Sequence, residues 1–332
     1  MSKWLLAHCG KPPGRADRTP TARLSYFRYN EIMRKFVLSV VLLIALVGSF
    51  YLLQKQSDYQ LPRSQIKPEE LYAGVSYEGI SDKYKVNLLS DKLVSPTRIR
   101  ITPDNQHLLV SQITGEVLGF DRVGSGWSDV PYLVTWVETR FPGFPPDEAG
   151  LAGISLSPDF AKNGKLFFLY TYKDKGGTTQ NRVSLAIIKE KSGKLVGDKP
   201  KLIYQANIAG AGSHQITDGV GISINNKPHL MFLIGEGFKS ERAQDPQVEG
   251  GKVMLIQEDG SNPLGNRPYA NPKVEALGIR NAFVITNNPS DSGKYLIADT
   301  GPDKYDRLIY THLTTGSRLN FNWSGDQEKL KE

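Results

Sequence analysis

The stretch RIRITPDNQHLLVSQ, residues 98–112, has the pattern of one β-hairpin. An alternating strand is followed by a Pro-Asp turn and then by a second strand. TGEVLGFDRV, residues 114–123, follows directly and adds a third strand. The sequence therefore predicts an antiparallel meander at the start of the folded part.

The same arrangement recurs three more times towards the C-terminus. Each copy is a hairpin with Pro-Asp, Asn-Asn or Asn-Pro in its turn, followed by another strand: 153–172 with 181–189, 219–237 with 251–260, and 281–301 with 306–313. No amphipathic helix separates the copies, so we expect radial repetition in an all-β propeller over residues 84–332. A β-sandwich of similar hairpins is the alternative fold.

Charge is distributed unevenly along the chain. The formal net charge is +7, from 41 basic and 34 acidic residues. Residues 1–35 hold eight of the basic and two of the acidic residues, whereas residues 54–332 hold 33 basic and 32 acidic ones. The part expected to fold therefore lacks a basic footprint, and no nucleic-acid partner is expected.

An uncharged segment, FVLSVVLLIALVGSFYLL, occupies residues 36–53. As a helix it would be about 27 Å long, close to the thickness of a bilayer core. With the basic tail 1–35 before it and a polar spacer at 54–83, it predicts a transmembrane signal anchor. We then expect a membrane-anchored protein with its catalytic domain extracytoplasmic, in the periplasm or at the cell surface. A cleaved signal peptide, a buried core helix and a start at Met33 are the alternatives.

Sequence motifs of several enzyme classes are absent. The chain has no P-loop, no G-x-G-x-x-G nucleotide fingerprint, no G-x-S-x-G elbow and no H-E-x-x-H zinc motif. Its single cysteine, Cys9, lies in the basic tail, so the expected propeller forms no disulfide and no thiolate metal site. No local sequence motif therefore supports a serine hydrolase or a zinc protease.

A longer match points to one family. EAGLAGISLSPDFAKNGKLFFLYT, residues 148–171, resembles the E/Q-x-G-L-L-G…P-D-F-x-x-N-G segment of the PQQ-dependent soluble aldose sugar dehydrogenases, the glucose/sorbosone dehydrogenase family. The resemblance continues in order over about residues 84–325, through GSHQITDGVGI (212–222), FLIGEGFKSERAQDPQVEGGKVMLIQEDGSNP (232–263), ALGIRNAF (276–283), IADTGPDKYDRLI (297–309) and, more weakly, RLNFNW (318–323).

This resemblance implies a six-bladed-type β-propeller with pyrroloquinoline quinone (PQQ) and calcium at its centre. It implies a quinoprotein that oxidises an aldose sugar at C1 to a lactone, with PQQ as hydride acceptor and a further electron acceptor as partner. His214 matches the family's catalytic base, and Glu236 stands where a carboxylate would orient the imidazole. The alternative is that His214 and Glu236 are loop residues without a catalytic role.

Further positions match cofactor and metal sites of the family. Arg280 and Asn281 would hold the quinone, since a guanidinium pairs bidentately with carboxylates. Glu148 lies at a position near sugar and cofactor, and Gly301 and Pro302 match backbone carbonyl ligands for calcium. For each, a solvated loop or turn residue is the alternative.

Three departures keep other functions open. Ala282 replaces the proline of the family's R-N-P, Arg307 stands at a glutamate position, and only about four blade patterns precede the last residue. A fragment, a different closure or a degenerate relative would each explain the missing blades. The alternative functions are a non-catalytic extracytoplasmic propeller that binds a glycan or protein, and a calcium-dependent lactonase.

Overall fold

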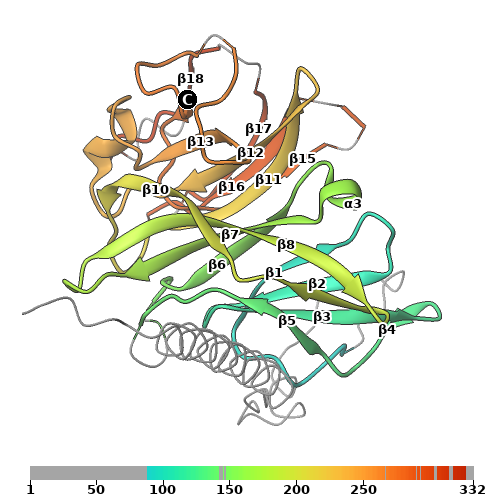
Figure 1. Cartoon of the computed structure of the whole chain (residues 1–332). Helices are drawn as coiled ribbons and strands as arrows, with labels where there is room; N and C mark the ends of the chain where they lie inside the picture. Colours follow the sequence, from blue (N-terminus) through green and yellow to red (C-terminus); the bar gives the residue numbers. More distant parts are fainter. Residues whose placement is uncertain are drawn as a thin grey trace, which may run out of the picture. The chain divides into compact units, whose positions relative to one another are not determined.

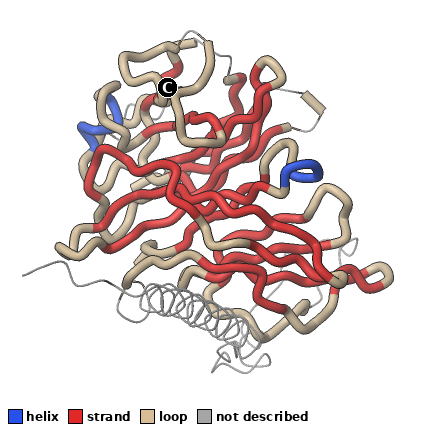
Figure 2. Tube along the Cα trace, viewed as in Figure 1, coloured by secondary structure: helices blue, strands red, loops and turns tan. Residues whose placement is uncertain are grey.

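The computed structural model describes residues 88–326, apart from 142–144, 146, 266, 289, 292, 303–304 and 314–316. The predicted tail 1–35, anchor 36–53 and spacer 54–83 lie outside the described residues. Strands dominate the described part, with short helical turns at α3 (Phe160–Asn163) and η1 (Ser240–Gln244) (Figure 2). No helix of this part is long and apolar enough to span a membrane.

The predicted meander forms the first sheet. It contains β1 (Pro96–Ile101), β2 (His107–Gln112), β3 (Glu116–Val123) and β5 (Tyr132–Trp136) in that order, with β4 (Gly126–Trp127) beside β3. The Asp104 carboxylate holds the turn between β1 and β2, because it accepts hydrogen bonds from the Thr102 hydroxyl at 2.6 Å and the Gln106 N–H at 3.0 Å.

Three more sheets follow in chain order (Figure 1). The second contains β6 (Leu151–Leu156), β7 (Lys165–Lys173), β8 (Thr179–Lys191), β9 (Lys194–Gly197) and β10 (Lys201–Ala209). The third contains β11 (Ile216–Ile224), β12 (Lys227–Ile234), β13 (Lys252–Gln257), β14 (Val274–Leu277) and β18 (Leu319–Asn320). The fourth contains β15 (Ala282–Asn287), β16 (Lys294–Asp299) and β17 (Arg307–His312).

The apolar cores lie between successive sheets. On β7, Phe168 packs against the first sheet, whereas Phe167 and Leu169 pack against the third. On β12, Phe232 faces the second sheet and Met231 faces the fourth. Because side chains alternate along a strand, the second strand of a blade is apolar on both faces and joins two neighbours. This arrangement confirms a propeller-like all-β fold with four blades among the described residues and excludes the two-layer sandwich.

The innermost strands of the blades approach each other closely. β6 packs against β1 and β11, and β11 packs against β15. A Cβ at Gly153 of β6 would lie 2.2 Å from the Thr217 carbonyl oxygen, so only glycine allows this contact between blades. Glycine in this strand is therefore a packing requirement.

A buried carboxylate joins three of these inner strands. Asp218 of β11 accepts hydrogen bonds from Arg100 of β1 at 2.6 Å and from the Ile285 N–H of β15 at 3.2 Å. Arg98 Nε lies 3.2 Å from the same carboxylate. Two guanidinium groups thus compensate one buried charge, which holds the first, third and fourth blades together.

The sequence patterns missed three later strands and one turn. β5, β10 and β14 were not predicted: β5 and β10 mix buried and exposed residues, and β14 is a short, fully buried strand between β13 and β18. The Pro-Asp turn after β6 contains α3, which ends at Gly164 with a φ of 61°. The four predicted hairpins are otherwise confirmed.

Candidate active site

The topology brings the predicted site residues to one rim of the propeller. Inner strands start at this rim and the strands paired with them end there. Glu148 precedes β6, His214 precedes β11, Arg280 and Asn281 precede β15, and Glu236 follows β12. Residues far apart in sequence therefore come from neighbouring loops of three blades.

His214 and Glu236 form a buried pair. The imidazole Nδ1 lies 2.7 Å from Glu236 Oε1, and the two residues are 6% and 3% exposed. A carboxylate accepts, so Nδ1 carries the donated proton, and in the neutral imidazole Nε2 is then the nitrogen with the lone pair. Glu236 Oε2 is buried and has no hydrogen-bond partner among the described residues. Glu236 therefore contacts the imidazole through one carboxylate oxygen.

The backbone around His214 is unusual and well supported. His214 has a φ of 58°, in the left-handed region. Its N–H donates to Glu148 Oε2 at 2.8 Å, and its carbonyl accepts the Gly237 N–H at 3.1 Å. A Cβ at Gly235 would lie 2.6 Å from the His214 carbonyl carbon, so glycine is required beside the histidine. These contacts hold the backbone that carries the imidazole.

Glu148 links the histidine loop to the fourth blade. Asn281 Nδ2 donates to Glu148 Oε1 at 3.1 Å and to Oε2 at 3.2 Å. The Arg280 carbonyl accepts the Glu236 N–H at 2.9 Å. Asn281 Oδ1 is buried without a hydrogen-bond partner in the described part of the chain. The five predicted catalytic and cofactor residues thus form one connected group.

Arg280 lies at the edge of this group. Its Nη1 donates to the Thr300 carbonyl at 3.0 Å, and its guanidinium carbon lies 5.7 Å from the centre of the Trp323 ring. Asp299 accepts the backbone N–H groups of Arg280 at 3.1 Å and Asn281 at 2.7 Å. The start of β15 is therefore held by a buried carboxylate.

Arg307 explains one departure from the family pattern. Its guanidinium bonds to the Asp299 carboxylate and to the Phe321 carbonyl, and it donates to the Gly278 carbonyl at 2.9 Å. A glutamate here would repel the buried Asp299. The arginine instead neutralises the acid that holds Arg280 and Asn281.

The turn predicted to bind calcium is tightly built. The Gly301 N–H donates to Asp306 Oδ1 at 2.9 Å, and a Cβ at Gly301 would lie 2.1 Å from the Tyr305 carbonyl oxygen. Within the described ranges, no group of three or more His, Cys, Asp or Glu residues could hold a metal ion.

Sequence reasoning missed several residues at this rim. Phe238 stacks on His214, with ring centres 4.2 Å apart and planes tilted by 30°. Trp323 lies beside Arg280, and Asp299 holds the two residues before β15. The only sequence signal for Phe238 is its position two residues after Glu236. The contacts of Trp323 and Asp299 arise only when the chain folds.

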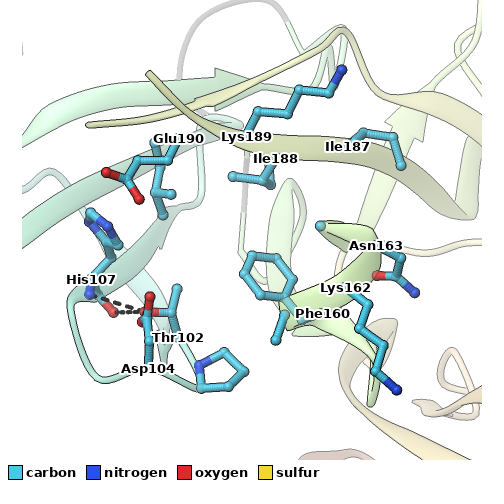
Figure 3. Close-up of a pocket in the computed structure, with 14 residues that line it drawn as sticks. Thr102, Asp104, His107, Phe160, Lys162, Asn163, Ile187, Ile188, Lys189 and Glu190 are labelled. Atoms are coloured by element: carbon cyan, nitrogen blue, oxygen red, sulfur yellow. Dashed lines mark hydrogen bonds between the residues drawn. The ribbon is translucent and has the colours of Figure 1, made fainter. Parts of the chain in front are cut away.

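A cavity of about 500 Å³ lies at the opposite ends of the strands (Figure 3). Thr102, Asp104 and His107 lie on one side, and Phe160 and Asn163 lie on the other. The residues that line it include none of the predicted site residues. His107 nevertheless has a geometry like that of His214, since its Nδ1 lies 3.0 Å from Asp121 Oδ1.

Solved structures share the fold of this chain. The PQQ-bound aldose sugar dehydrogenase of Streptomyces coelicolor superposes with a TM-score of 0.55 at 22% identity, covering 71% of this chain and 64% of that one. The apo form of the soluble aldose sugar dehydrogenase of Escherichia coli gives 0.54 at 21% identity, covering 71% and 65%. These likenesses establish the propeller fold.

The predicted localisation is corrected by these findings. The Escherichia coli relative is a soluble protein, and no helix in the described part of this chain could cross a membrane. A membrane-anchored protein with an extracytoplasmic catalytic domain is therefore a wrong prediction. It depended on residues 36–53, which lie outside the described residues and whose length is near the lower limit for a span.

Two curated relatives match part of the chain. Aldose sugar dehydrogenase YliI of Escherichia coli (strain K12) is 25% identical over 219 residues, covering 64% of this chain and 55% of the relative. Quinoprotein glucose dehydrogenase B of Acinetobacter calcoaceticus is 23% identical over 248 residues, covering 69% and 50%. The chain spans about half the length of these relatives.

The family itself is identified by a longer match. The sequence model of the Glucose / Sorbosone dehydrogenase family matches residues 93–317, which include every predicted site residue and all strands of the four blades except β18. The order of the motifs, the propeller fold and this match agree. The chain belongs to the glucose/sorbosone dehydrogenase family.

Proposed function

We propose that this chain is a PQQ-dependent dehydrogenase that oxidises an aldose sugar at C1 to a lactone. The observation that carries the proposal is the buried His214–Glu236 pair, 2.7 Å apart, on the rim that also presents Arg280. Family membership and the named activities of the relatives support the same reaction class. The substrate is a sugar, and a separate acceptor removes the electrons.

His214 acts as the general base in this proposal. Glu236 accepts a hydrogen bond from the Nδ1–H group, so the lone pair of the neutral imidazole remains on Nε2. An anomeric hydroxyl that donates to Nε2 loses its proton there as C1 is oxidised. The Glu236 carboxylate stabilises the imidazolium that forms, because the two groups are buried together.

Arg280 and Asn281 would hold the cofactor. PQQ, when bound, supplies a two-electron acceptor for the hydride that leaves C1. Within the described residues the Arg280 guanidinium makes one hydrogen bond, to Thr300, so further N–H donors remain for an anionic carboxylate or a quinone oxygen. Asn281 Oδ1 is also without a partner among the described residues, but it accepts hydrogen bonds and would need an N–H or O–H group of the ligand. The free N–H donors of Arg280 are therefore what fits an anionic quinone.

Glu148 has a supporting role in the proposed site. Both of its carboxylate oxygens already accept hydrogen bonds, from the His214 N–H and from Asn281. It therefore orients the base and the amide from one position. Its negative charge is partly compensated by these donors, which reduces its repulsion of an anionic cofactor.

Calcium would be held by the backbone carbonyls of Gly301 and Pro302, together with oxygens of the cofactor. Calcium accepts such hard oxygen ligands in flexible numbers. The Asp306 contact to the Gly301 N–H supports the turn that presents them. A six-bladed architecture belongs to the same proposal, and the described residues form four blades.

A dye-reduction assay with PQQ, calcium and an aldose panel tests the reaction. We expect activity that is lost in His214→Asn, because asparagine tolerates the left-handed backbone but cannot act as the base. His107→Asn is the matched control, since His107 is an equally buried histidine beside a carboxylate at the opposite ends of the strands. Full activity of His214→Asn, or no PQQ binding by fluorescence titration, would contradict the proposal.

A non-catalytic propeller that binds a glycan is the second candidate. It is favoured by an acid, Glu148, beside the proposed cofactor residues, because a carboxylate there repels an anionic quinone. Sugar binding without any PQQ binding would support it over the dehydrogenase.

A further inference from the structure

A second cavity lies between the third and fourth blades, where β11 and β12 pack against β15. It has a volume of about 600 Å³, within the range of sites that bind small molecules. The ends of β11, β15 and β17 and the start of β16 line most of it. His214 precedes β11, so this cavity lies at the opposite ends of the strands from the candidate active site and contains none of its residues.

Tyr295 lines this cavity and has an unpaired hydroxyl. The residue is 5% exposed, and its ring belongs to the apolar core between the two blades. Buried tyrosines normally find a hydrogen-bond partner, as Tyr170, Tyr204 and Tyr269 do in this protein. The Tyr295 hydroxyl has no partner among the described residues and is not sealed from solvent. It therefore opens into the cavity.

Glu275 contributes an acceptor to the same cavity. The residue is 2% exposed, and its Oε2 pairs with the Arg267 guanidinium. Its other oxygen, Oε1, accepts no hydrogen bond in the described part of the chain and is not sealed from solvent. Because Arg267 compensates the charge, the cavity receives an oxygen acceptor without a net charge.

Asn287 adds an amide to the cavity lining. It lies directly opposite Tyr295 in the pairing of β15 with β16. Opposed side chains of an antiparallel pair share one face of the sheet, which for Tyr295 is the face towards the third blade. The Asn287 side chain makes no hydrogen bond within the described ranges. Three polar side chains with unused hydrogen-bonding capacity therefore line one cavity.

Much of the remaining lining is apolar. Met231 and Leu313 are buried in the core between the blades, and Ile222 and Ile224 are partly buried against it. None of the described residues that line the cavity is a lysine or an arginine, so an anionic ligand finds no cationic partner there. A fitting ligand therefore combines several hydroxyls with C–H surface and has no charge.

We propose that this cavity binds a neutral cyclic polyol, such as an inositol or a monosaccharide, at a site separate from the candidate active site. Each hydroxyl is both a donor and an acceptor, so a polyol can pair with the Tyr295 hydroxyl, the Glu275 carboxylate and the Asn287 amide. Its C–H groups pack on the apolar side chains, which water alone would leave hydrated. The inference goes beyond the proposed reaction and does not depend on it.

Titration of the full chain with myo-inositol tests the site, because this polyol has no anomeric carbon to oxidise. Calorimetry would compare wild type with Tyr295→Phe and Asn287→Ala. Tyr295→Phe keeps the ring in the core and removes only an unpaired hydroxyl, so we expect unchanged stability and about tenfold weaker binding. Asn287→Ala changes an exposed position and should weaken binding about threefold or more.

Tyr170→Phe is the matched control, because Tyr170 is 4% exposed and its hydroxyl lies 3.0 Å from that of Ser184. This variant should lose stability and bind myo-inositol as wild type does. His214→Asn separates the two sites, and its affinity for myo-inositol should equal that of wild type. Glucuronate is the anionic probe, and any binding of it should be insensitive to Tyr295→Phe.

Four results would overturn the inference: no myo-inositol binding by wild type, unchanged binding by Tyr295→Phe, loss of binding in His214→Asn, or glucuronate binding that Tyr295→Phe weakens. A loss of stability in Tyr295→Phe as large as that in Tyr170→Phe would also overturn it, because the hydroxyl would then have a partner in the protein. Binding of myo-inositol that depends on Tyr295, with no PQQ binding and no dye reduction, removes the dehydrogenase and keeps this site.

Discussion

The carboxylate of Glu148 accepts the backbone N–H of His214 at 2.8 Å, although the two residues are 66 positions apart in sequence. This contact joins the loop before β6 to the loop before β11. It holds the histidine in its left-handed conformation, and the same carboxylate binds Asn281 of the fourth blade. The orientation of the candidate base therefore depends on a second blade.

Removal of the Glu148 side chain should misplace the base. For Glu148→Ala we expect kcat in dye reduction to fall roughly 10- to 100-fold, because small errors in position are costly in catalysis. Glu148→Gln keeps one acceptor oxygen and should lose less. Glu138→Ala removes an acid from an exposed pair with Arg140 and serves as the control. A wild-type kcat in Glu148→Ala would show that the contact does not orient the base.

Glu236→Gln tests the carboxylate beside the imidazole. The amide has the shape of the acid but carries no charge, so it cannot stabilise the imidazolium. We expect a loss in kcat of about 100-fold or more, with little change in melting temperature.

The control is Glu258→Gln, which neutralises a buried acid paired with Lys165 at 2.7 Å. That variant should change stability and leave kcat per folded molecule unchanged. Equal kcat in Glu236→Gln and wild type would exclude a role for the charge.

Arg307→Ala should destabilise the fourth blade. It leaves the Asp299 carboxylate, which is fully buried, without its cationic partner. The free energy of unfolding should fall by about 3–5 kcal/mol, measured by urea denaturation. Adding Asp299→Asn should restore part of the loss, since the uncompensated charge is then gone. Arg140→Ala, at an exposed pair, should have no measurable effect.

Lys252 gives the fold a dependence on pH. Burial lowers the pKa of Lys252 from 10.5 to about 7, although its ammonium donates to the carbonyls of Arg242, Ala243 and Gly250. Between these two pKa values the folded protein binds fewer protons than the unfolded chain. Stability relative to Lys252→Met should therefore rise with pH above about 7, by up to about 1.4 kcal/mol per unit. Parallel stability curves for the two proteins from pH 6 to 9 would contradict this.

Much of the fold was predictable because it is encoded locally. Hairpin turns such as Pro103-Asp104 and the continuous apolar run along β7 depend on neighbouring residues. Outer strands such as β10 were missed, because only one of their faces packs against a core and their apolar pattern is therefore weak. The site residues were predictable through the family motif, which names positions and says nothing of their contacts.

The sequence by itself determined the repeated hairpins, the glycines needed between blades and the positions of His214, Glu236 and Arg280 at strand ends. Only the tertiary structure decided which groups meet: Glu148 under the histidine loop, Arg307 on Asp299, and Phe238 on the imidazole. The physical reason is that strand period and turn chemistry act over a few residues. Pairing of buried charges and rings depends on loops that approach each other only after the blades have packed.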